Sequence, residues 1–93
     1  MIYIVSKEIK IKKESKDEFN KFIKEWIYKS KQQELNLSID GFWVADKFMI
    51  FERWSSEESF LKFTKLPEYK VFLTTIESFG TEPLKVKKIK TII

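Results

Sequence analysis

The chain has 93 residues and a mass of 11.3 kDa, which predicts a single domain over residues 1–93. It lacks cysteine, which excludes disulfides, thiolate catalysis and zinc ribbons, and it lacks histidine, the commonest general base and transition-metal ligand. Basic residues exceed acidic ones by 18 to 14, a net charge of +4, yet Arg53 is the single arginine. Because proteins that read nucleic acids depend on arginine for bidentate base contacts, this composition argues against a nucleic-acid partner.

From the printed sequence we expect neither a membrane span nor a secretory signal. No stretch approaches the roughly eighteen consecutive apolar residues of a membrane-spanning helix. The first ten residues, MIYIVSKEIK, lack the basic start and the small-residue cleavage site of a secretory signal. We therefore expect a cytoplasmic protein with no membrane partner. The chain has only two glycines, so a glycine-rich phosphate loop is excluded as well.

Residues 2–11 are rich in Ile, Val and Tyr and predict a strand. The alternation places one apolar set on a single face: Tyr3, Val5, Ile9 and Ile11. Ser15 and Glu18 then have the spacing of a capping box, in which the serine accepts from a helical amide and the glutamate reaches back to the cap. This pattern predicts that a helix begins at Ser15.

The helix predicted over residues 15–34 has an aromatic stripe. Its apolar positions follow helical spacing: Phe19, Phe22, Ile23, Trp26 and Ile27. The stripe fades after Ser30, and Asn36 can end the segment. Such a stripe packs into the core or lines a ligand cavity, and one residue can do both.

Residues 37–44 and 47–54 predict two strands joined by a short turn, hence a hairpin. The second strand is apolar on both faces. Phe48 and Ile50 share one parity, whereas Met49 and Phe51 share the other. A strand with one solvated face would alternate with polar residues, so we expect both faces of this sheet to be covered.

The last third of the chain predicts two helical segments and a final strand. Ser55 and Glu58 repeat the capping-box spacing before a short helix that buries Phe60 and either Phe63 or Thr64. Pro67 suits the first turn of a further helix, and Gly80 is expected to end it in the left-handed conformation. Residues 83–93 predict the fourth strand, and the slip in its alternation at Lys87-Lys88 suggests a bulge or a twisted edge.

The resulting order, β-α-β-β-α-β, is the ferredoxin-like α+β plan with a four-stranded antiparallel sheet and helices on one face. No predicted helix remains for the second face. A homodimer that packs sheet against sheet in a shared barrel would cover it. The alternative is an apolar sheet face that binds another ligand or partner.

Glu52 and Trp54 are the candidate groups for chemistry. They end the strand over residues 47–54 on the parity of Phe48 and Ile50. A carboxylate buried without a partner has a raised pKa and can act as a general base near neutral pH. The alternative for Glu52 is a structural role, bonded to backbone amides or to a lysine. The indole N–H of Trp54 needs a partner if it is buried, and could point at a substrate or close the core. The acidic residues show no metal-ligand spacing, so we expect no metal site.

Two stretches carry a family resemblance. Phe51-Glu52-Arg53-Trp54-Ser55-Ser56-Glu57-Glu58-Ser59-Phe60 and Pro67-Glu68-Tyr69-Lys70-Val71-Phe72 resemble the antibiotic biosynthesis monooxygenase (ABM) family. The family pattern runs E-x-W, an acidic helix start, a short helix and S-P-x-F, and Glu82-Pro83-Leu84 fits the beginning of the last strand. The resemblance implies a dimeric α+β barrel, in agreement with the dimer expected from residues 47–54.

The chain also departs from the family. Many members carry one histidine in the short helix and another just after the proline, where this chain has Phe63 and Glu68. The haem-degrading branch uses Asn, Trp and His at positions that align with Ser6, Phe63 and Leu73. Without histidine, axial ligation of haem iron by that residue is impossible, which argues against this branch.

The resemblance implies an ABM-like monooxygenase that needs no cofactor and oxidises a small aromatic or quinol-type molecule between helices and sheet. Glu52 would be the base or orienter, with Trp54 and Tyr69 as hydrogen-bond donors. The expected substrate-binding residues are Ser6, Phe19, Phe22, Trp26 and Phe63. The alternative is a non-catalytic module of the same fold that binds a small hydrophobic ligand or only dimerises.

Overall fold

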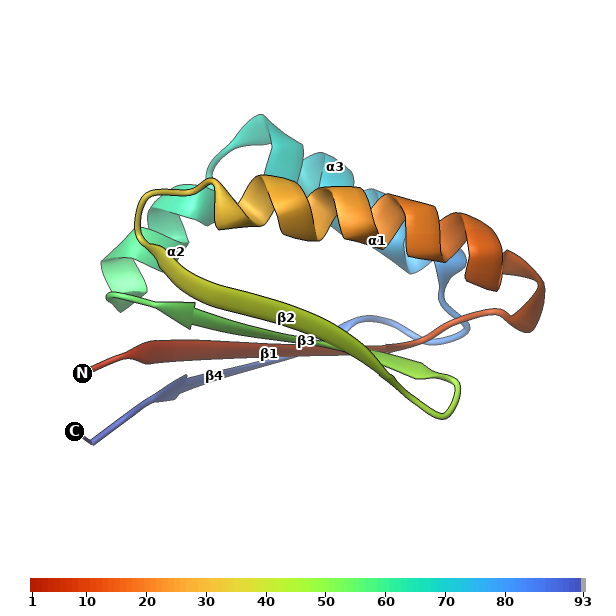
Figure 1. Cartoon of the computed structure of the whole chain (residues 1–93), viewed down its shortest axis with the longest axis horizontal. Helices are drawn as coiled ribbons and strands as arrows, with labels where there is room; N and C mark the ends of the chain where they lie inside the picture. Colours follow the sequence, from red (N-terminus) through yellow and green to blue (C-terminus); the bar gives the residue numbers. More distant parts are fainter. Residues whose placement is uncertain (93) are drawn as a thin grey trace.

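The computed structural model describes residues 1–92, so Ile93, the last residue of the predicted fourth strand, lies outside the described residues. The elements follow the predicted order, with the second helical region split in two (Figure 1). They are β1 (Tyr3–Lys10), a 3-10 turn η1 (Lys13–Ser15), α1 (Lys16–Lys31), β2 (Asn36–Val44), β3 (Lys47–Trp54), α2 (Glu57–Thr64), α3 (Pro67–Phe79) and β4 (Lys85–Lys90).

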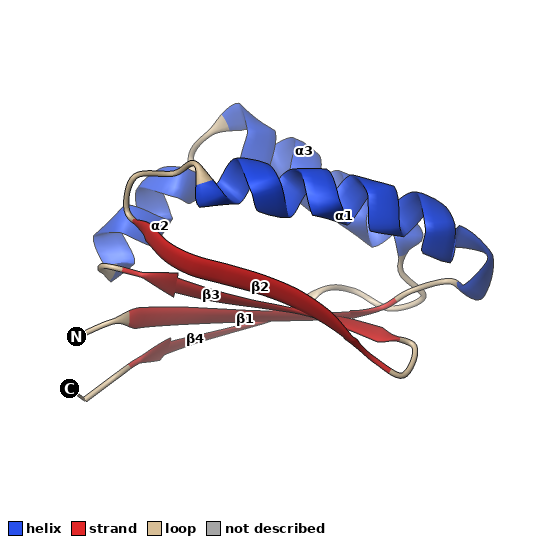
Figure 2. Ribbon diagram, in the orientation of Figure 1, coloured by secondary structure: helices blue, strands red, loops and turns tan. Residues whose placement is uncertain are grey.

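The four strands form one antiparallel sheet in the order β2-β3-β1-β4. All three α-helices lie over one face of it, and the opposite face carries no other described element of the chain (Figure 2). The predicted α+β, ferredoxin-like fold is therefore confirmed. Among residues 1–92, no helix has both the length and the apolarity to cross a membrane.

Alternation along β1 and β3 sets the two faces of the sheet. The helix-facing side chains of β3 are buried: Phe48, Ile50, Glu52 and Trp54. Their neighbours on β1 are also buried: Tyr3, Val5, Lys7 and Ile9. The core thus forms between these two central strands and the helices, and it includes two charged residues of opposite sign.

Helix α1 comes close to the sheet at Gly41 of β2. A Cβ atom at this position would lie 2.6 Å from Ile27 Cδ1 and 2.7 Å from Phe48 Cζ. A side chain here would force Ile27 and Phe48 to shift, so the close packing of helix on strand, rather than backbone freedom, favours glycine. Beside it, Trp43 donates a hydrogen bond from Nε1 to Asn20 Oδ1 of α1 at 3.1 Å.

The open face of the sheet carries the other parity. Met49 and Phe51 of β3 are half-buried there, and Phe42 of β2 is 44% exposed opposite Met49. Ile4 of β1 and Ile89 of β4 lie opposite each other on the same face. This assigns the two parities of β3, which the sequence had left open: Phe48 and Ile50 face the helices.

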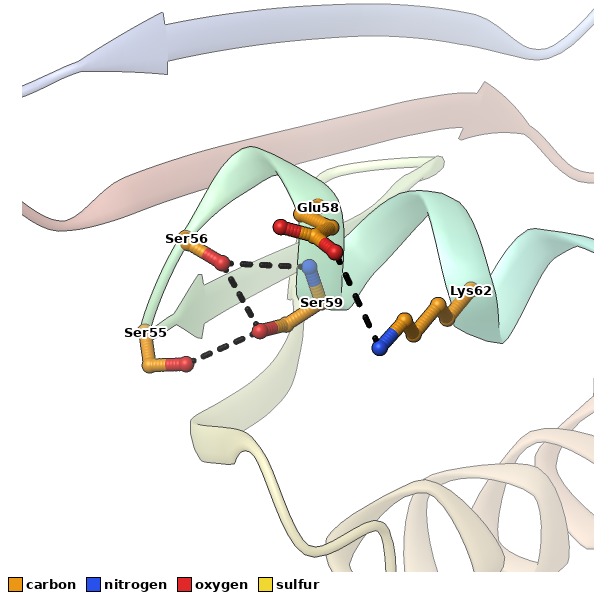
Figure 3. Close-up of polar contacts among 5 residues, drawn as sticks. All are labelled: Ser55, Ser56, Glu58, Ser59 and Lys62. Carbon is orange, nitrogen blue, oxygen red and sulfur yellow. Dashed lines mark hydrogen bonds and ion pairs between the residues drawn. The ribbon is translucent and has the colours of Figure 1, made fainter.

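Both predicted capping boxes are wrong in detail. Ser15 precedes α1 but makes no side-chain capping bond, because the η1 turn leads the chain into the helix. The second cap is Ser56 rather than Ser55: its hydroxyl accepts from the backbone N–H of Ser59 at 3.1 Å (Figure 3). Ser55 instead contacts the hydroxyl of Ser59 at 3.0 Å.

Two expectations near the C-terminus also need correction. Gly80 does end α3, but with φ −90° and ψ 153° it is extended rather than left-handed. A Cβ atom there would lie 2.6 Å from Ile9 Cδ1, so close packing explains this glycine. The register of β4 against β1 is unbroken, so no bulge occurs at Lys87-Lys88. The strand is nevertheless an edge strand, with exposed lysines at 85, 87, 88 and 90.

Candidate functional site

The centre of the site is an ion pair between β1 and β3. Lys7 Nζ lies 2.7 Å from Glu52 Oε2, and the two side chains are 0% and 1% exposed. Trp54 Nε1 donates a hydrogen bond to the other carboxylate oxygen, Oε1, at 3.0 Å. Both oxygens of Glu52 are therefore engaged by side chains from neighbouring positions of the same sheet face.

Aromatic rings surround the ammonium group of Lys7. Its Nζ lies 4.9 Å from the ring centroid of Tyr69, 5.2 Å from that of Phe72 and 5.7 Å from that of Phe60. An ammonium has three N–H donors, and among residues 1–92 Lys7 Nζ has no hydrogen-bond partner beyond its contact with Glu52. The ring faces offset part of the cost of burying the charge.

Rings from all three helices fill the space between α1 and the sheet. Phe63 of α2 lies 4.9 Å from Trp54 and 5.4 Å from Tyr69 between ring centroids. Trp26 of α1 stacks on Phe72 of α3 at 4.2 Å. Side chains thus occupy the region where the sequence suggested a substrate cavity.

A groove of about 370 Å³ opens between α1 and α3 on the outer side of this cluster. Its apolar wall is formed by Phe22, Trp26, Pro67, Val71 and Phe72, and its rim carries Glu25, Lys29 and Glu68. A second hollow of about 250 Å³ also reaches Trp26, together with Phe63 and Leu66. Lys7 and Glu52 line neither hollow, whereas Phe72, whose ring centroid lies 5.2 Å from Lys7 Nζ, lines the first.

Trp26 has an unusual polar atom. Its indole Nε1 is buried and has no hydrogen-bond partner among the described residues. A buried donor without an acceptor costs free energy, on the order of 1–3 kcal/mol. An acceptor atom brought next to this nitrogen would recover that cost, provided that the rings around it move apart.

The structure brings five of the predicted site residues together: Trp26, Glu52, Trp54, Phe63 and Tyr69. Phe22 lies on the wall of the outer groove. Phe19 packs near the beginning of α1, where its ring centroid lies 5.6 Å from that of Trp43 and 5.0 Å from that of Phe48. Ser6 is on the open face of the sheet opposite Phe51, away from all of the others.

Lys7 was not predicted as a site residue from the sequence. Its position in β1 shares the parity of Tyr3, Val5 and Ile9, so strict alternation already placed it on the buried face. A lysine at such a position needs an anion, and Glu52 is at the buried parity of a second apolar strand. Together these two observations indicate two buried charges of opposite sign, and the register of β1 against β3 makes them neighbours.

Tyr3 lies at the same end of the sheet, 5.8 Å from Phe60 between ring centroids. Burial raises the pKa of its hydroxyl above the ordinary value of 10.0. The neighbouring carboxylate of Glu57, to which the hydroxyl donates, raises this pKa further. Tyr3 therefore remains a neutral donor at physiological pH.

Within residues 1–92, no group of three or more acidic side chains is arranged to hold a metal ion.

A family model described as antibiotic biosynthesis monooxygenase matches residues 2–75. Among curated proteins, no sequence matches the chain. Several solved structures resemble it. That of Rv0793 from Mycobacterium tuberculosis has a TM-score of 0.90 at 15% identity, covering 100% of this chain and 97% of that one.

A conserved protein from Methanosarcina mazei Go1 has a TM-score of 0.91 at 14% identity, with 98% of this chain and 93% of that one covered. A structure described as an antibiotic biosynthesis monooxygenase has a TM-score of 0.86 at 18% identity, with both chains covered completely, at 100% each. At these identities the likeness concerns the fold.

Proposed function

Because the chain belongs to the antibiotic biosynthesis monooxygenase family, we propose that it oxidises a small aromatic or quinol-type substrate with molecular oxygen. For a hydroquinone, one oxygen atom enters the ring to give a hydroxyquinone and the other leaves as water. The substrate supplies the electrons once it is deprotonated, so the proposal includes no cofactor. The observation that carries the proposal is the buried Lys7–Glu52 pair.

Glu52 is proposed as the base. When its carboxylate takes the proton of a substrate hydroxyl, the negative charge moves from Glu52 to the substrate oxygen. Lys7 then faces an anion in place of the carboxylate, so the buried site keeps a paired charge throughout the transfer. The unused N–H donors of Lys7 support this role, since they can bind the substrate oxyanion.

Trp54 and Tyr69 have different proposed roles. The hydrogen bond from Trp54 Nε1 holds Glu52, so Trp54 is a positioning residue. The ring of Tyr69 lies 4.9 Å from Lys7 Nζ, which supports its phenol as a second donor to a substrate oxygen. Phe19 and Phe63 would belong to the apolar walls around the substrate.

The outer groove between α1 and α3 is the proposed way in. Its walls include Phe22, Trp26 and Phe72, whose faces suit a planar aromatic molecule. Because Trp26 and Phe72 are stacked across the route to Lys7, the substrate would have to displace these rings. The orphan N–H of Trp26 would then gain an acceptor on the substrate.

One observation favours the non-catalytic alternative. The carboxylate of Glu52 is almost completely shielded from solvent and is engaged by Lys7 and Trp54. A ligand-binding or dimerisation module would need no opening of this pair. In either function, a homodimer that covers the apolar open face of the sheet remains part of the proposal.

Oxygen uptake separates these functions. We would measure it with a panel of anthrones and quinols, without added metal or flavin. Glu52→Gln should lower turnover by roughly 10²–10⁴-fold, since it removes a positioned base, at a temperature where circular dichroism shows the variant to be folded. Glu77→Gln, exposed on α3 and outside both hollows beside Trp26, is the matched control and should keep activity. Ligand binding without oxygen uptake across the panel would favour the non-catalytic module.

A further inference from the structure

A third hollow, of about 460 Å³, lies where the end of β1, the β2–β3 turn and the start of α1 meet. Figure 1 shows this region at the far end of the molecule from the two termini. Its lining shares no residue with the α1–α3 groove. The lining residues that matter here are Lys10, Lys12, Lys13, Lys16, Trp43 and Asp46.

The charge of this lining is strongly positive. Four of its residues are lysines, and Asp46 is its single carboxylate. Asp46 is paired with Lys10, whose Nζ lies 3.4 Å from Oδ2. The excess positive charge is therefore concentrated on Lys12, Lys13 and Lys16. Lys12 Nζ also donates to the backbone carbonyl of Ser78 at 3.2 Å, and the like charges that line this hollow favour an anion there.

Trp43 gives the hollow a fixed aromatic wall. Its Nε1 is held by Asn20 Oδ1, and its ring packs edge-on at 5.2 Å from Phe48. Lys16 Nζ lies 4.8 Å from the centroid of the same ring. The ammonium of Lys16 thus lies over the ring of Trp43, and the orientation of this ring is set before any ligand arrives.

We propose that this hollow binds a phosphate monoester carried on an aromatic ring. Three lysines without a carboxylate partner suit a dianionic phosphate better than a single carboxylate charge, and lysine binds phosphate as a point charge. The aromatic part of the ligand stacks against Trp43. A volume of this order is typical of small-molecule sites. The site is independent of the proposed oxygenase chemistry.

The test uses phenyl phosphate as the probe, with inorganic phosphate and benzoate as comparators. Calorimetry should show phenyl phosphate binding at least about tenfold more tightly than either comparator. In ¹⁵N-labelled protein, the indole N–H signal of Trp43 should shift on binding. That signal is assigned by its loss in Trp43→Phe.

The double variant Lys13→Gln/Lys16→Gln should weaken phenyl phosphate binding by about tenfold or more, because it removes two charged partners of the phosphate. Lys24→Gln/Lys31→Gln is the matched control, since it removes the same charge from α1 outside the hollow. This control should bind phenyl phosphate as tightly as the unaltered chain.

Three results would overturn the proposal. Equal binding of phenyl phosphate and inorganic phosphate would leave the aromatic wall without a role. An equal loss in the two double variants would show a general charge effect. Tighter binding of a single-stranded oligonucleotide would make nucleic acid the occupant instead, if its affinity falls with salt concentration as steeply as contacts to several phosphates require. None of these results depends on oxygen uptake, so they leave the oxygenase proposal untouched.

Discussion

Lys7 Nζ and Glu52 Oε2 lie 2.7 Å apart in the core, with both side chains almost fully buried. Each charge is the partner that makes burial of the other tolerable. Removing one of them leaves a buried charge without a partner. Removing both eliminates the cost of burying the charges as well as the attraction between them. The stability of this pair is therefore strongly non-additive.

Lys7→Met or Glu52→Gln alone should each lower the free energy of unfolding by about 3–5 kcal/mol. The double variant should lose much less than the sum, because glutamine still accepts the hydrogen bond of Trp54. Urea denaturation of the unaltered chain, the two single variants and the double variant gives the interaction energy of the pair as a double-mutant cycle. Additive losses would mean that the two charges do not interact in the folded chain.

The start of α2 depends on one serine hydroxyl. Ser56→Ala should destabilise the chain by about 1 kcal/mol, since the N–H of Ser59 loses its acceptor. Ser15→Ala is the control, because Ser15 stands before α1 without a capping bond and its loss should change the urea midpoint little. A larger effect for Ser15 than for Ser56 would contradict the observed caps.

Tyr3 makes stability depend on alkaline pH. Its raised pKa means that the unfolded state releases the hydroxyl proton first as the pH rises. The contribution of Tyr3 is fully present below its ordinary pKa of 10.0, and it is lost as the pH rises from there through the raised value. Urea midpoints measured across this range should fall more steeply for the unaltered chain than for Tyr3→Phe. Parallel curves would show that the phenol does not titrate differently on folding.

The open sheet face should form a homodimer interface. Sedimentation equilibrium at micromolar concentration should give twice the 11.3 kDa chain mass. Phe51→Lys should dissociate or unfold the dimer, because it places a charge among the apolar residues Met49 and Phe42 of this face. Tyr28→Lys, on an exposed part of α1, should keep the dimer mass. A clean monomer for the unaltered chain would remove the argument.

The order and faces of the elements could be predicted because periodicity determines them. In residues 47–54, period-two alternation placed Glu52 and Trp54 with Phe48 and Ile50, and the structure confirms this shared face. The caps could not be predicted to the residue, because Ser55 and Ser56 both precede acidic residues at the helix start. Gly80 was assigned to a left-handed cap because glycine commonly ends helices in that way. Its close contact with Ile9 depends on the tertiary fold and is not visible in the sequence.

The candidate site was predictable on one strand only. Glu52 was identified from its own strand, but its partner comes from a strand that is more than forty positions away along the chain. A single sequence does not give the register that brings Lys7 beside it. Ser6, one residue earlier, was assigned to the site by alignment with the family's first-strand asparagine, although its side chain points to the other face. One step along a strand exchanges the two faces of a sheet.

The lysines of β4 also restrict how copies of the chain can aggregate. An edge strand has unpaired backbone groups, and another chain can pair with them to extend a sheet into a fibril. In β4, Lys85, Lys87, Lys88 and Lys90 are exposed along that edge. A copy that added its own β4 would bring these ammonium groups opposite one another, and like charges at this spacing repel. The charge of this one strand therefore works against amyloid-like growth at an edge that the fold leaves uncovered.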